Sequence, residues 1–129
     1  MRHNLLLGGI SIVAAVLPGW IAVVSALGFG ASPTIWMVLH YGVPALSVLI
    51  AGVLLALGQK SARAWALSAW VLLLLVAGFD LATTWWSFAP GGEFPSEIVT
   101  AEIGYLLGSA AMLWAVAKRH SQANSPQGA

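Results

Sequence analysis

The sequence predicts an all-α integral membrane protein, a four-helix bundle of four transmembrane helices with both termini in the cytoplasm (N-in/C-in). Of its 129 residues, 60% are hydrophobic and only 7% are charged, whereas a soluble domain carries about 25% charged residues. The mean hydropathy is +0.90. The apolar residues gather in four runs, each near the ~20 residues that a helix needs to cross a hydrocarbon core about 30 Å thick. The basic residues lie only before the first run, between the second and third runs and after the fourth, which is one side of the expected membrane, and this asymmetry predicts the orientation.

The first span is expected over residues 5–27. Its apolar run is longer than the ~7–15 residues of a signal-peptide core, and no A-x-A cleavage site follows it, so a retained helix is expected. Pro18 lies in its interior. Because proline has no backbone N–H, the carbonyl of Ala14 loses its helical partner, and a kink is expected there.

The second span is expected over residues 34–57. Ser32-Pro33 supplies an N-cap followed by proline at the first helical position, and Gly58 supplies a stop. Pro44 frees the carbonyl of His40, which predicts a second kink beside the histidine.

The third span is expected over residues 64–87 and the fourth over residues 97–117. Tryptophans near both ends of the third span fit the aromatic belts at membrane interfaces, while Asp80 lies inside it. Ser96 can cap the fourth span. Residues 1–117 therefore form one transmembrane domain, and the polar residues 118–129 are expected to be a disordered cytoplasmic tail.

The orientation follows from the Lys and Arg residues, which precede the first span, occupy the middle turn or follow the fourth span: Arg2, Lys60, Arg63, Lys118 and Arg119. The positive-inside rule then predicts a protein of the plasma (inner) membrane with both termini cytoplasmic. Its expected partner is the lipid bilayer. The basic residues mark orientation, so no nucleic-acid partner is expected. No cysteine is present, which excludes disulfides, thiolate metal sites and iron–sulfur clusters.

One histidine and two carboxylates share a predicted depth. His40 and Asp80 lie about six residues and Glu102 about five residues from the outer ends of their spans, which places them roughly 7–9 Å below the outer interface. Tyr105 and Thr84 lie near the same layer. Ionisable groups at membrane depth are expensive and need partners or water, so these five residues are the candidate ligand- or ion-binding residues.

Several functions fit this layer. The leading hypothesis is a non-enzymatic accessory or binding module that holds a cation, a proton or a small polar group. A small transporter or channel is the alternative, and a membrane enzyme with His40 and a carboxylate as acid–base pair on a lipophilic substrate is a further one. His40, Asp80 and Glu102 also suit a divalent metal, although the sequence requires no cofactor. The same groups can serve only as interhelical hydrogen bonds.

A GxxxG pattern, Gly104 and Gly108, lies on the fourth span, on a face roughly opposite to Glu102. Small residues at this spacing let helices approach closely. The pair is expected to serve either packing within the chain or contact with another membrane protein or a second copy in a homodimer. The sequence names neither the ligand nor the partner.

Overall fold

A computed structural model of the chain describes residues 2–27, 34–87, 93 and 95–124. This part of the chain is helical and contains no strand, and it includes four apolar segments long enough to cross a membrane: Arg2–Ala26, Ile35–Ala56, Ala62–Ser87 and Ser96–Lys118. The all-α prediction with four long apolar helices is confirmed. The helices are α1 (Arg2–Ala14), α2 (Val16–Ala26), α3 (Thr34–Ala56), α4 (Ala62–Ser87) and α5 (Ser96–Asn124).

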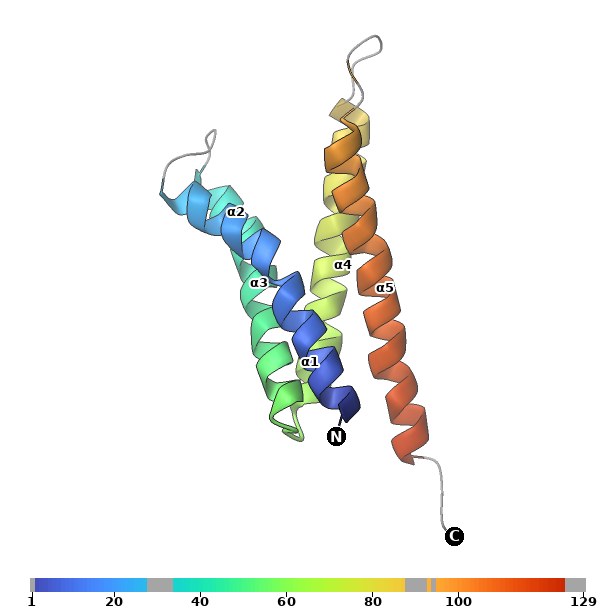
Figure 1. The fold of residues 1–129 in the computed structure, drawn as a ribbon. Coiled ribbons are helices and arrows are strands. Elements are labelled where there is room, and N and C mark those ends of the chain that lie inside the picture. The colour runs from blue at the N-terminus through green and yellow to red at the C-terminus, as the bar shows by residue number, and fades with distance from the viewer. Residues whose placement is uncertain (1, 28–33, 88–92, 94, 125–129) are drawn as a thin grey trace.

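The helices form two hairpins that share one end and diverge toward the other (Figure 1). In the first hairpin α1 and α2 pack against α3, and in the second α4 packs against α5, while α3 against α4 joins the two. The start of α1, the turn between α3 and α4 and the end of α5 lie at the end where the hairpins converge. At the opposite end α2 leans away from α4 and α5.

The first span is interrupted just before Pro18, where the position of this proline predicts a kink. α1 ends at Ala14 and α2 begins at Val16, so Ala15 stands between two helical segments. The Ala15 N–H is shared between the carbonyls of Ser11 and Ile12, both at 3.2 Å, and this tightened turn precedes Pro18. At Pro44, where the second kink is expected, the helix is not interrupted, and α3 runs continuously through this proline.

α3 ends in a Schellman motif built on Gly58. This glycine has a φ of +67°, a left-handed conformation that glycine adopts without a Cβ penalty. Its N–H donates to the carbonyl of Leu55 at 3.1 Å, and the N–H of Gln59 donates to that of Leu54 at 3.0 Å. The predicted stop at Gly58 is confirmed, and α4 can turn back alongside α3.

α1 and α3 touch through two glycines. A Cβ on Gly8 would lie 2.7 Å from the carbonyl oxygen of Gly52, and one on Gly52 would lie 2.9 Å from that of Gly8. In the same half of the bundle, where the hairpins converge, α4 also packs closely. Trp70 of α4 is 2% exposed there, and its indole N–H donates to the Ser11 hydroxyl oxygen at 3.2 Å. The converging half is therefore a packed core.

α5 extends beyond the expected end of the fourth span at Ala117. It continues to Asn124, and no proline or glycine occurs between Lys118 and Pro126. Residues 125–129, the end of the tail expected over residues 118–129, lie outside the described residues. The Lys118 ammonium nitrogen lies 4.6 Å from the centre of the Trp114 ring on the extended helix. Gly104 and Gly108 find no atom within 4 Å of an added Cβ, so this pair does not pack against another helix of the described chain.

Candidate functional site

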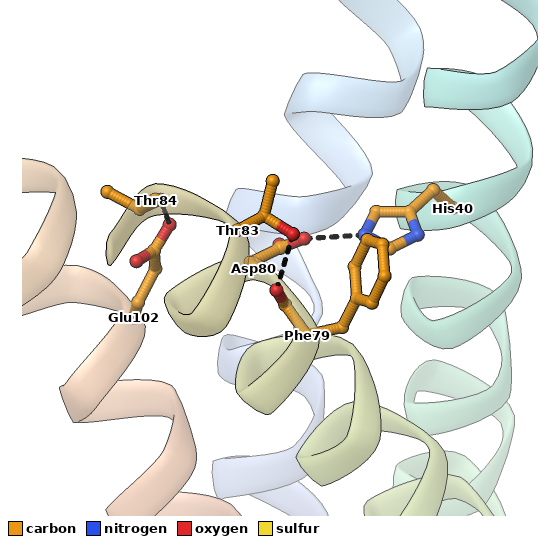
Figure 2. Close-up of polar contacts among 6 residues, drawn as sticks. All are labelled: His40, Phe79, Asp80, Thr83, Thr84 and Glu102. Atoms are coloured by element: carbon orange, nitrogen blue, oxygen red, sulfur yellow. Dashed lines mark hydrogen bonds and ion pairs between the residues drawn. The ribbon is translucent and has the colours of Figure 1, made fainter. Parts of the chain in front are cut away.

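His40 of α3 and Asp80 of α4 form a hydrogen-bonded pair between the two hairpins. The His40 Nε2 atom and the Asp80 Oδ1 atom lie 2.6 Å apart (Figure 2). An ionised carboxylate can only accept, so the ring N–H is the donor in that state. Their side chains are only 10% and 16% exposed. A short contact to an ionised partner is among the stronger hydrogen bonds in proteins, so this pair holds the hairpins together in the diverging half.

Three aromatic rings fix the imidazole of His40. Trp36, one turn earlier on α3, stacks on it with ring centres 5.3 Å apart. Tyr41 and Phe79 approach it edge-on at 4.8 and 5.5 Å. Because Phe79 directly precedes Asp80, α4 supplies both a ring contact and the hydrogen-bond acceptor. The histidine is held in one orientation.

Glu102 makes a separate pair. The Thr84 hydroxyl of α4 donates to the Glu102 Oε1 atom of α5 at 2.7 Å (Figure 2). The second carboxylate oxygen, Oε2, is buried and has no hydrogen-bond partner among the described residues. Thr83, the neighbour of Thr84, donates instead to the Phe79 carbonyl of its own helix at 2.8 Å. Glu102 therefore bonds Thr84 of α4 rather than Asp80.

The predicted layer thus resolves into two pairs that share α4. His40 and Asp80 are brought together, and so are Thr84 and Glu102. Within the described residues no three His, Asp or Glu side chains are grouped closely enough to hold a metal ion, so the metal site suggested for His40, Asp80 and Glu102 is not formed. Equal depth along three helices does not set the direction of each side chain around its helix axis, and here the directions differ.

A pocket of about 210 Å³ lies between the hairpins beside these pairs. Its polar lining consists of two carboxylates and two phenols: Asp80, Glu102, Tyr41 and Tyr105. Its apolar lining comes from α2, α4 and α5: Leu17, Pro18, Ile21, Leu73, Val76, Ala77, Ile98 and Ala101. A mostly apolar cavity with a few convergent polar groups is typical of small-molecule sites. Depth counting from the sequence had no means of finding this cavity.

Tyr105 supplies a hydrogen-bond donor where Pro18 removes one from the first span. Its hydroxyl on α5 donates to the backbone carbonyl of Ala14 at 3.0 Å. That carbonyl is the one that Pro18, four residues later, cannot bond because it has no N–H. Buried backbone carbonyls need a partner, above all in hydrocarbon. The kink of the first span and the position of Tyr105 are therefore parts of one arrangement beside the pocket.

We expect Tyr105→Phe to lower the free energy of unfolding by about 1 kcal/mol, because it leaves the Ala14 carbonyl without a donor. Denaturant titration of the purified protein in detergent micelles measures the change. In a Pro18→Ala background the restored N–H bonds Ala14 within the helix, so the same tyrosine substitution should cost markedly less. Equal costs in the two backgrounds would contradict the coupling. Thr100→Val, an exposed hydroxyl removal on α5, is the matched control.

Comparison with protein-family models, curated proteins and solved structures finds no match to this chain.

Proposed function

We propose that this chain is a multi-pass protein of the inner membrane that binds the polar end of a small lipophilic molecule in the pocket between its hairpins, without catalysing a reaction. Four long apolar helices support the membrane location. The positive-inside rule supports cytoplasmic termini, since all five Lys and Arg residues lie at the start of the first span, in or next to the turn between α3 and α4, or at and just beyond the end of the fourth span. Those three regions lie at one end of the molecule (Figure 1).

The pocket is the observation that carries the proposal. Asp80 and Glu102 lie there against apolar walls, and their positions in the sequence predict a depth at which a bilayer offers little water. Polar groups are costly there, and a chain needing only interhelical hydrogen bonds is served by uncharged side chains at lower cost. A cavity that gathers both carboxylates supports a binding role beyond helix packing.

Binding is favoured over transport because the opposite half of the bundle is closed. Val48 is fully buried and Trp70 is 2% exposed, and the backbones of α1 and α3 meet at Gly8 and Gly52. A transporter needs a polar path from the pocket toward the cytoplasm. This packed core stands in the way of such a path.

Photoreactive dodecyl amphiphiles test the proposal. We expect a dodecyl probe with a diazirine in its tail to label pocket-lining peptides of α2, α4 and α5 saturably in protein reconstituted in phosphatidylcholine nanodiscs. Ala101→Trp should abolish that labelling, because Ala101 is an exposed pocket-lining residue at which an indole fills the cavity without overpacking the core. Ala110→Trp, exposed on the same helix but outside the pocket, should leave it intact.

The contrary result is equally clear. Labelling spread over all lipid-facing positions, unsaturable and equal in the wild type and Ala101→Trp, would overturn the binding role. The series should include alcohol, amine and carboxylic acid headgroups on the same tail, so that the outcome does not depend on guessing the ligand's polar end.

A further inference from the structure

The pocket is rich in acceptors and poor in donors. Its four polar side chains are two carboxylates, which only accept when ionised, and two phenol hydroxyls. Among the described residues, no lysine or arginine lines it. Both hydroxyls are already engaged, that of Tyr105 with the Ala14 carbonyl and that of Tyr41 with Asp80. A molecule that fills this pocket meets groups that require donated hydrogens.

With both carboxylates ionised, the charges in the pocket do not balance among the described residues. His40 can carry one positive charge and is bonded to Asp80. Glu102 is bonded to a hydroxyl, which supplies a hydrogen bond but no charge. Its Oε2 atom is buried with no partner in the described chain. A buried carboxylate oxygen without a donor is unfavourable by the full desolvation cost of that group, so the site lacks a donor for this oxygen, and a cationic donor would also balance the charge of an ionised Glu102.

The apolar part of the pocket indicates what that cation is attached to. Leu17 and Ile98 line it and are 43% and 56% exposed. They come from α2 and α5, on the two sides of the divergence between the hairpins. An alkyl chain extending from the pocket would lie against these side chains and reach the lipid, whereas a hydrated inorganic ion would gain nothing from them.

We infer that the ligand is a lipophilic amine in its protonated form, with its ammonium group donating to Glu102 and Asp80 and its alkyl body against the apolar wall. This inference rests on the proposed binding function. An ammonium group has three donors and one positive charge, which is what the unpartnered Glu102 oxygen and the uncompensated carboxylate lack. A fatty acid brings a like charge to the carboxylates, and an alcohol brings one donor and no charge.

The dodecyl photoprobes distinguish these headgroups. With an identical tail, the amine probe should label the pocket with an apparent affinity about tenfold or more above that of the alcohol probe, and the acid probe should not label it. Glu102→Gln should weaken the amine probe about tenfold and leave the alcohol probe unchanged. Glu97→Gln, an exposed acid on the first turn of the same helix, should change neither.

Two contrary results separate this inference from the binding function itself. If all three headgroups label the pocket equally, or if Glu102→Gln weakens them all alike, the amine inference is wrong while the pocket remains a binding site. If no probe labels the pocket saturably, both proposals fail. Because the comparison between headgroups is made within one variant, a general loss of fold in Glu102→Gln cannot imitate the expected selective loss.

Discussion

Gly8→Ala should lower the free energy of unfolding by about 1–3 kcal/mol, the usual cost of forcing extra volume into a packed core. The added methyl group would lie 2.7 Å from the Gly52 carbonyl oxygen and 3.0 Å from the Ala56 nitrogen. Both are backbone atoms of α3, which cannot rotate aside as a flexible side chain can. The two helices must separate, and the loss is measured by denaturant titration in detergent micelles.

The neighbouring residue supplies a matched control for this result. Gly9 is exposed and has no atom within 4 Å of an added Cβ. Because alanine is favoured over glycine inside a helix by about 0.5–1 kcal/mol, Gly9→Ala should leave the protein equally stable or slightly more stable. A Gly8→Ala protein as stable as Gly9→Ala would show that α1 and α3 do not meet at this glycine.

Asp80→Leu should be the most damaging substitution at the candidate site, with a loss of about 2 kcal/mol. It leaves the His40 ring N–H, in a side chain only 10% exposed, without its acceptor. Asp80→Asn keeps an acceptor oxygen at the same place, so its loss should stay below about 1 kcal/mol. Thermal unfolding of the two purified variants side by side measures the difference.

Equal unfolding temperatures for the leucine and asparagine variants would be incompatible with a buried His40–Asp80 bond. Thr83→Val is the appropriate control on α4, because it also removes a polar group one turn from Asp80. The Thr83 hydroxyl is exposed and bonds only the Phe79 carbonyl of its own helix. Its removal should therefore change stability far less than Asp80→Leu does.

The four helical segments could be predicted because their signals are local. The length of each apolar run sets the span, glycine sets the stop at Gly58, and proline sets the break near Ala15. Polarity alone predicts disorder for residues 118–129, whereas α5 continues to Asn124, two residues before the first proline or glycine that follows Gly108. The end of a helix depends on caps and breakers as well as on polarity.

The candidate site could be predicted only along one axis. Counting residues placed His40, Asp80 and Glu102 at one depth, and the first two do meet. Glu102 instead faces Thr84, because rotation around each helix and the angle between helices depend on packing over the whole bundle. The pocket, made by the divergence of the hairpins, has the same origin.

The glycine contacts also depend on packing between helices and not on a pattern within one helix. The GxxxG pair Gly104 and Gly108 has open space around it, whereas Gly8 and Gly52, which lie on different helices, meet at backbone contact. A pattern on one helix shows that close approach is allowed. Which helix packs against such a glycine depends on both helices, and on contacts between residues that are far apart in the chain.

The bond from Tyr105 to Ala14 also has a consequence for biosynthesis. The two residues are separated by 91 positions, and a ribosome makes the N-terminal one first. If the spans insert in chain order, as the proposed membrane location implies, the oxygen that Pro18 leaves without a helical donor has no phenol to accept from at first, because that tyrosine has not yet been translated. The nascent kink then needs another donor, such as water, until the last span inserts, so the arrival of the last helix would release that water from the first.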